Sequence, residues 1–147
     1  MKKASARLSV AQKKALVAGG RTTEWSRTIY GSPQSKANSR QQVRIKDRIV
    51  FIKSQAALAY LSDFLKQCPT LDPMYECDIE IVVDIYYSSR RPDLDESLIM
   101  DALQGKVYRN DRQIRRKIVT GHVDKDNPRA ELYIRPYAAE EPDTADE

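Results

Sequence analysis

The chain has few of the residues that build metal clusters and disulfides: two cysteines and one histidine among 147 residues. These numbers are too small for a Cys/His zinc cluster. Cys68 and Cys77 have eight residues between them, including two prolines. In a reducing compartment we expect two free, buried thiols rather than a disulfide. The sequence therefore indicates neither a Cys/His zinc site nor a disulfide.

Long apolar stretches are also missing from the sequence. No run reaches the roughly 18 residues that a membrane span needs. Gln12, Lys13 and Lys14 interrupt the apolar region that a signal peptide would require near the N-terminus. We therefore expect a cytoplasmic protein with no membrane partner. The hydrophobic fraction of 41% and the charged fraction of 31% are typical of one globular domain with its own core.

Charge, in contrast, is abundant and unevenly distributed. Residues 1–48 contain twelve Lys and Arg against two acids, whereas the last ten residues contain five acids and no base. A basic segment indicates a polyanionic partner and an acidic end is typical of a solvated tail, although both could serve solubility alone. We expect a basic arm over residues 1–31, partly disordered or helical, a folded domain over 32–137, and an acidic disordered tail over 138–147.

Apolar periodicity predicts an α+β fold in which two or three helices pack on one mixed β-sheet in a single compact domain. Ser54 is expected to cap the longest helix, and Pro69 to end it. The buried face of that helix is predicted to hold Ala57, Leu58, Leu61, Leu65 and Cys68. The expected elements are a short helix near 10–17, a β-prone stretch over 44–52 that turns back at 46–47, a helix from 55 to 68, a strand over 78–88, a short helix over 98–103, and strands over 113–123 and 129–137.

The stretch RPDLDESLIMDALQGKVYRNDRQIRR, residues 91–116, mixes aspartates with arginines and lysines. Pro92 favours extended backbone, on which Asp93 and Asp95 point the same way. Carboxylates suit Mg²⁺ or Mn²⁺, and Mg²⁺ typically takes one or two of them together with water and substrate phosphate. Asp111 can join this site if the strand after it pairs near the strand over 78–88, and a metal there would activate water against a phosphodiester. Alternatively, the aspartates only form turns and helix caps.

Within this stretch, the elements RPDLD, DALQG and VYRNDRQI resemble the core signature of RusA-like Holliday junction resolvases, and a looser match extends over about residues 32–136. The resemblance implies a Mg²⁺-dependent endonuclease that cuts four-way DNA junctions as a homodimer in a bacterium or bacteriophage. It implies that Asp93, Asp95 and Asp111 hold the metal. The family usually carries a lysine four residues after the second aspartate, where this chain has Ile99. We expect Lys106, or else Lys117, to supply the missing catalytic charge.

Basic residues surround the candidate acids, and we expect them to neutralise DNA phosphates. A solvated basic strand face is the alternative. Tyr108 could stack on an exposed base. Because the family lysine is missing, a catalytically weak or inactive module that binds branched DNA is a second candidate, and a nuclease for flaps or single strands is a third. The expected DNA-binding residues are Arg90, Arg91, Arg109, Arg112, Arg115, Arg116 and Lys117.

Overall fold

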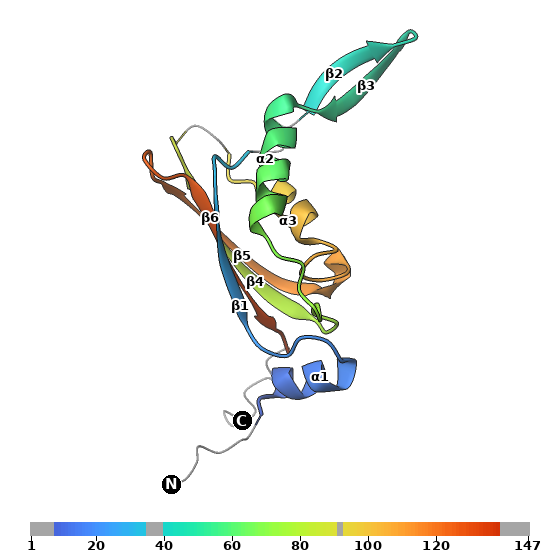
Figure 1. The fold of residues 1–147 in the computed structure, drawn as a ribbon, viewed down its shortest axis with the longest axis vertical. Coiled ribbons are helices and arrows are strands. Elements are labelled where there is room, and N and C mark those ends of the chain that lie inside the picture. The colour runs from blue at the N-terminus through green and yellow to red at the C-terminus, as the bar shows by residue number, and fades with distance from the viewer. Residues whose placement is uncertain (1–7, 35–39, 91–92, 139–147) are drawn as a thin grey trace, which may run out of the picture.

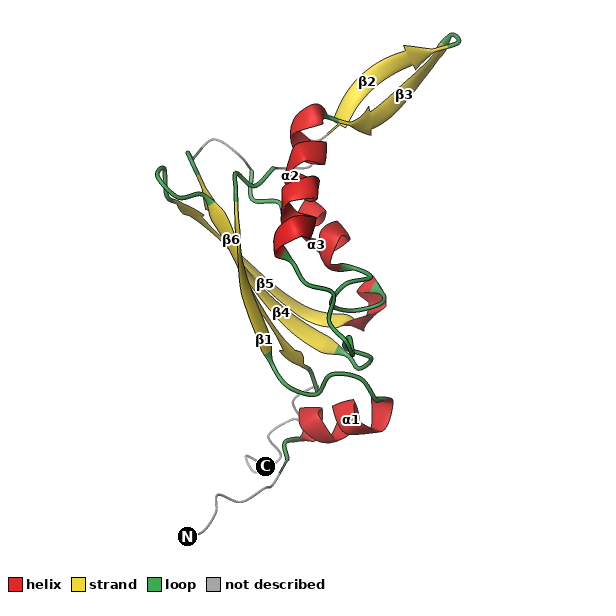
Figure 2. Ribbon diagram, in the orientation of Figure 1, coloured by secondary structure: helices red, strands yellow, loops and turns green. Residues whose placement is uncertain are grey.

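A mixed four-stranded sheet forms the body of the protein, with the strands in the order β1 (Trp25–Tyr30), β6 (Arg129–Pro136), β4 (Ile79–Tyr87) and β5 (Ile114–Val123). Helices α2 (Gln55–Gln67) and α3 (Ser97–Leu103) cover one of its faces (Figures 1 and 2). The computed structural model describes residues 8–34, 40–90 and 93–138. This architecture confirms the expected α+β class with a mixed sheet. None of the described helices is long and apolar enough to cross a membrane. The elements are α1 (Val10–Ala18), β1 (Trp25–Tyr30), β2 (Arg40–Ile45), β3 (Arg48–Lys53), α2 (Gln55–Gln67), β4 (Ile79–Tyr87), α3 (Ser97–Leu103), the 3₁₀ turn η2 (Asp111–Gln113), β5 (Ile114–Val123) and β6 (Arg129–Pro136).

Strand β4 is the centre of the core, as its alternation of apolar residues predicts. It pairs antiparallel with β6 and parallel with β5. Its residues at alternate positions are buried beneath the helices, whereas Val82, Asp84 and Tyr86 lie on the opposite face and are partly exposed. A parallel pair needs a crossover connection, and here α3 lies in that crossover. The buried residues of β4 are Ile79, Ile81, Val83, Ile85 and Tyr87.

Helix α2 begins where the sequence predicts but turns a different face to the core. The Ser54 hydroxyl accepts the Ala57 N–H at 3.2 Å, which confirms the expected cap. Leu58 and Leu65 are 48% and 44% exposed, so their predicted burial was wrong. The helix instead buries two aromatic rings, because these bring the most apolar area into the core. The buried residues of α2 and its C-cap are Ala57, Tyr60, Phe64 and Cys68.

Strand β1 is not predicted by the sequence. Residues 25–30, which the charge pattern places in the basic arm, pair antiparallel with β6 at one edge of the sheet. Trp25 and Ile29 are its buried residues. They are four positions apart, so the strand has no visible alternation of apolar and polar residues. Helix α1, which precedes this strand, lies where the sequence predicts a short helix.

Both cysteines are free and buried, as expected. Burial raises the pKa of the Cys68 thiol and of the Cys77 thiol. The two thiols are therefore held in their neutral form within the core.

Helix α3 buries the position where the resemblance would place a lysine. Ile99 is 2% exposed and belongs to the main core cluster. We predict that Ile99→Lys lowers the free energy of unfolding by about 3–5 kcal/mol, because it places an unpaired charge in an apolar site. Urea denaturation would measure this loss. Ile118→Lys is the matched control, since Ile118 is 39% exposed on β5, and equal stability of the two variants would contradict the placement of α3.

Candidate functional site

The candidate acids form two groups, one at each end of α3. Asp93 and Asp95 lie in the loop that enters this helix, and Asp111 lies at the start of η2, beyond its other end. Each group is next to a buried tyrosine. Tyr87 contacts the loop before α3, and Tyr108 lies near Asp111.

The loop before α3 is held by the Tyr87 hydroxyl. This hydroxyl donates to the Asp93 carbonyl and accepts the Asp95 N–H, both at 3.1 Å. Burial, together with the carboxylates of Asp95, Glu96 and Asp93, raises the pKa of Tyr87, so the phenol stays neutral and keeps its proton for this bond. Tyr87 thereby fixes the backbone on both sides of Leu94.

Asp95 also organises the first turn of α3. Its Oδ1 accepts the Ser97 N–H at 2.8 Å and the Ser97 hydroxyl at 2.6 Å. A carboxylate near the N-terminus of a helix satisfies a free backbone donor and is favoured by the helix dipole. Asp95, which precedes the N-cap residue Glu96, therefore bonds to the first residue of α3. Asp93 is exposed to solvent.

The same loop runs back along β5 and meets Lys117. Leu94 lies against Gly121, where an added Cβ would come within 3.1 Å of Leu94 Cδ1. Two residues later, Glu96 Oε2 lies 2.5 Å from Lys117 Nζ. Because Glu96 directly follows Asp95, this ion pair holds a lysine from a different strand close to the acidic loop.

Asp111 is anchored at the far end of α3. Its N–H donates to the side-chain oxygen of Gln104, the C-cap residue of α3, at 3.2 Å. Burial, together with the carboxylates of Asp111 and Asp101, raises the pKa of Tyr108. Asp101 of α3 therefore lies near Tyr108, as Asp111 does.

The parallel pairing of β4 and β5 separates the two groups. It puts Asp111 beside the start of β4, whereas Asp93 and Asp95 follow the end of β4. The seven residues of α3 span about 10 Å between them. Among the residues that the structure describes, no three His, Cys, Asp or Glu side chains gather closely enough to hold a metal ion. The donors suit a hard divalent cation, but their arrangement is not a three-carboxylate centre.

Lys106 lies away from the acidic loop, in the turn that follows α3. Its carbonyl accepts the Leu71 N–H at 2.8 Å. This backbone bond places the turn that contains Lys106 against the segment that follows α2. Of the two lysines named from the sequence, Lys117 is the one with a side-chain contact to this loop.

The expected DNA-binding residues do not form one surface. Neighbouring residues of β5 point to opposite faces of the sheet. Arg116 lies 3.9 Å from Glu80 on the uncovered face, whereas Lys117 reaches the loop on the helix side. Arg91 lies outside the described residues. Arg109 pairs with Glu76 at 2.6 Å, and Arg115 pairs with Asp78 at 3.1 Å. The remaining two expected residues, Arg90 and Arg112, are exposed.

Tyr108 does not have the role in base stacking that the sequence suggested. Its side chain is completely buried, and its hydroxyl donates to the Met100 carbonyl at 3.1 Å. A base has no access to this ring. Tyr108 therefore positions the turn near Asp111 from inside the core.

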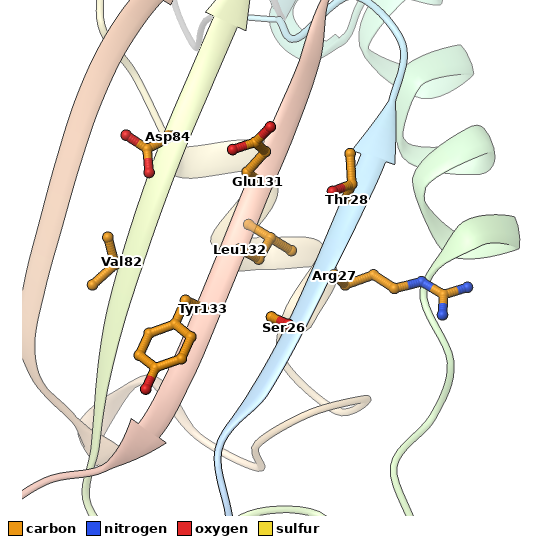
Figure 3. A pocket seen from close by; sticks show the side chains of 8 residues that line it. All are labelled: Ser26, Arg27, Thr28, Val82, Asp84, Glu131, Leu132 and Tyr133. Carbon is orange, nitrogen blue, oxygen red and sulfur yellow. The ribbon is translucent and has the colours of Figure 1, made fainter.

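The uncovered face of the sheet carries polar residues that sequence reasoning did not connect. Asp84 of β4 and Glu131 of β6 are directly paired positions there (Figure 3). His122 Nε2 lies 2.8 Å from Asp84 Oδ1, and Arg129 donates to Glu131 Oε2 at 2.9 Å. The His122 ring and the Arg129 guanidinium both contact the Tyr86 ring, at 4.3 Å and 3.8 Å from its centre. Alternation in β4 placed Asp84 and Tyr86 on this face, but their partners come from distant strands.

The Tyr87 hydroxyl should be necessary for the geometry of the acidic loop. We predict that Tyr87→Phe lowers the free energy of unfolding by about 1–2 kcal/mol, because a partly buried carbonyl and N–H lose their partner. Amide hydrogen exchange at Asp95 should also become faster. Tyr133→Phe is the control, since its hydroxyl bonds to the exposed Glu24 at 2.5 Å. Unchanged exchange at Asp95 in the Tyr87 variant would contradict this account.

Comparison with known proteins identifies the family. A family model described as Endodeoxyribonuclease RusA matches residues 30–135, which is 106 of the 147 residues. No curated protein gives a significant match. The matched residues include Asp93, Asp95 and Asp111, and the match agrees with the resemblance inferred from the sequence. The chain therefore belongs to the RusA endodeoxyribonuclease family.

Proposed function

We propose that this protein is a Mg²⁺-dependent endonuclease that resolves four-way DNA junctions in recombination and repair. The observation that carries the proposal is the family match over residues 30–135, because it spans the whole acidic segment and the strands around it. The family is one of endodeoxyribonucleases, so hydrolysis of DNA phosphodiesters is the reaction class. The metal, the junction substrate and a homodimer are finer points of the proposal.

We assign the metal to Asp93 and Asp95, and we keep Asp111, which the family resemblance implies as a third ligand, as a further candidate. Asp93 and Asp95 share one short loop, and Mg²⁺ typically takes one or two protein carboxylates and completes its shell with water and substrate oxygens. Asp111 would have to approach from the other end of α3 to become a third ligand. When bound, the ion would supply Lewis acidity and lower the pKa of a bound water. The chain itself would orient the loop through Tyr87 and Ser97.

Lys117 is the cation that we assign to catalysis in place of the family lysine. The assignment is supported by its 2.5 Å contact with Glu96, next to Asp95. A fixed positive charge at this point would stabilise the negative charge that develops on the phosphate during hydrolysis. Lys106, which the sequence analysis favoured, lies beside the end of α2 and is the alternative.

The exposed basic residues near both ends of α3 would hold the DNA backbone. Arg90 and Arg112 are exposed, and Arg109 and Arg115 are paired to acids at the protein surface. Surface ion pairs of this kind contribute little stability, so phosphate can replace the acid at small cost. Contacts with several phosphates would make the affinity strongly dependent on salt.

A homodimer would match the symmetry of the substrate. A four-way junction has two-fold symmetry and requires two paired cuts. Two copies related by a two-fold axis present two identical sites. This part of the proposal rests on the geometry of the substrate.

A binding module without turnover is the second candidate. It is favoured by the burial of Ile99 and by the separation of the acids into two groups. Such a protein would bind branched DNA through the same basic residues but would not cleave it. Cleavage by the unmodified protein therefore separates the two candidates.

One experiment tests the function. A labelled synthetic four-way junction is incubated with the protein with Mg²⁺ and with EDTA, alongside a flap, a single strand and a linear duplex. We expect paired cuts in the junction only when Mg²⁺ is present. Tight binding without cuts would favour the binding module, and faster cutting of the flap or single strand would reassign the substrate.

Asp95→Asn should separate catalysis from folding. Asparagine retains an oxygen that can accept the Ser97 N–H, so the contact with the first residue of α3 is kept. We predict that cleavage falls by more than about 100-fold, because a metal ligand is lost, while junction affinity stays equal or rises. Gel-based cleavage and binding assays measure both quantities. Asp101→Asn, exposed on α3, is the control, and full cleavage by Asp95→Asn at saturating Mg²⁺ would refute the proposed site.

Lys117→Ala and Lys106→Ala distinguish the two candidate lysines. We predict that Lys117→Ala slows cleavage by roughly 100-fold, because a charge next to the reacting phosphate is lost, and that Lys106→Ala has little effect. Single-turnover rates with a junction substrate provide the measurement. Glu96→Gln is the matched control, since it breaks the ion pair but keeps Lys117. A loss as large in Glu96→Gln would mean that the ion pair only supports the loop.

A further inference from the structure

Strands β2 and β3 form a hairpin outside the main sheet. They pair only with each other in a two-stranded sheet, and Figure 1 shows this hairpin projecting beyond α2, away from the body. No described residue of the hairpin belongs to the main core cluster. Each strand has six residues and spans about 20 Å. An isolated hairpin of this kind is only marginally stable in water, so contact with a partner would stabilise it.

The tip of the hairpin carries both positive charge and exposed apolar side chains. Ile45 is 51% exposed and Ile49 is 53% exposed. Arg44 is paired across the strands with Ile49, and Ile45 with Arg48. Because cross-strand partners share a face and neighbours alternate, each face of the tip presents one isoleucine beside one arginine. The two faces are therefore chemically equivalent, unlike a hairpin that packs on a protein surface through one apolar face.

The turn at the tip is strained and ends in a charged residue. Lys46 and Asp47 both have positive φ, 48° and 64°. Two-residue hairpin turns with this geometry prefer asparagine, aspartate and glycine, because most other residues meet steric resistance there. The chain nevertheless has a lysine at this position, exposed at the outermost point of the hairpin. Lys46 and the carboxylate of Asp47 are therefore both presented at the end of the hairpin.

We propose that the β2–β3 hairpin is a DNA-contacting arm, in which Arg44, Lys46 and Arg48 pair with phosphates and Ile45 and Ile49 contact bases at the branch point. This inference rests on the proposed junction substrate. Residues 40–53 contain five Lys and Arg against one acid. This excess of positive charge favours a polyanion such as DNA as the partner. A partner that surrounds the tip matches its two equivalent faces.

The dimensions of the arm also suit DNA. A two-stranded β-ribbon fits the major groove, which is about 12 Å wide. Apolar side chains, isoleucine among them, are known to press between bases and unstack them. Bases at a branch point are easier to unstack than bases inside a duplex. Contact with bases at the junction would bury the two isoleucines that the free protein exposes.

The phosphate contacts are tested by the salt dependence of binding. Arg44→Gln with Arg48→Gln is compared with Lys66→Gln with Lys125→Gln, which removes the same charge from exposed positions on the body. We expect the slope of log affinity against log salt for a four-way junction to become shallower by about 2 in the hairpin variant, because about 0.9 is lost per phosphate contact. An unchanged slope would overturn the proposal.

The base contacts are tested with 2-aminopurine placed at the branch point. Unstacking raises its fluorescence, so we expect a rise with the parent protein and loss of most of it with Ile45→Ser and Ile49→Ser combined. Ile118→Ser, an exposed isoleucine on the body, should keep the parent signal. A full signal from the hairpin variant would overturn the proposal. The proposal would also be overturned if that variant lost self-association in a sedimentation experiment while its DNA affinity stayed unchanged.

The hairpin inference and the proposed function can fail separately. Suppose that the parent cuts junctions and that the hairpin variants have the salt slope and the 2-aminopurine fluorescence of the parent. Only the hairpin inference is then overturned. If the parent neither binds nor cuts a junction, both are overturned. A circular dichroism spectrum and a melting temperature equal to those of the parent would show that the body of each variant has stayed folded.

Discussion

The parallel pairing of β4 with β5 is the constraint on which the rest of the structure depends. A parallel pair cannot be joined by a tight turn, so the chain must return along one face of the sheet before β5 begins. That return contains the acidic loop, α3 and η2. It places the first aspartates and Asp111 at opposite ends of α3, and it puts Lys117 of β5 beneath the loop. The composition of the candidate site thus follows from the pairing of two strands.

Buried tyrosine hydroxyls connect this core to the candidate site. Tyr87, at the end of the most buried strand, bonds to the backbone on both sides of Leu94. Tyr108 bonds to the carbonyl of Met100 in α3 and lies near Asp111. Each ring is packed in the core while its oxygen reaches polar groups, which is the usual way that a buried tyrosine is satisfied. The acids are therefore held in place by the same residues that stabilise the sheet.

Charge on the rest of the molecule is divided between paired and exposed groups. On the uncovered face of the sheet, Asp84 has a hydrogen-bond partner in His122 and Glu131 has a cationic partner in Arg129. On the β2–β3 hairpin, Arg44 and Arg48 are exposed beside isoleucines. The first arrangement is satisfied within the chain, whereas the second leaves both charge and apolar area to a partner. The hairpin is therefore the surface that we propose for contact with DNA.

The sequence alone determined most elements, because alternation in β4 and the Ser54 cap are local properties of neighbouring residues. It also indicated the family, through short motifs around Asp93, Asp95 and Asp111. It did not determine β1, whose apolar residues Trp25 and Ile29 are too far apart to show a period. Only the tertiary structure decided which acids lie together and which lysine meets them, since strand direction and long-range contacts bring together residues that no spacing in the sequence relates.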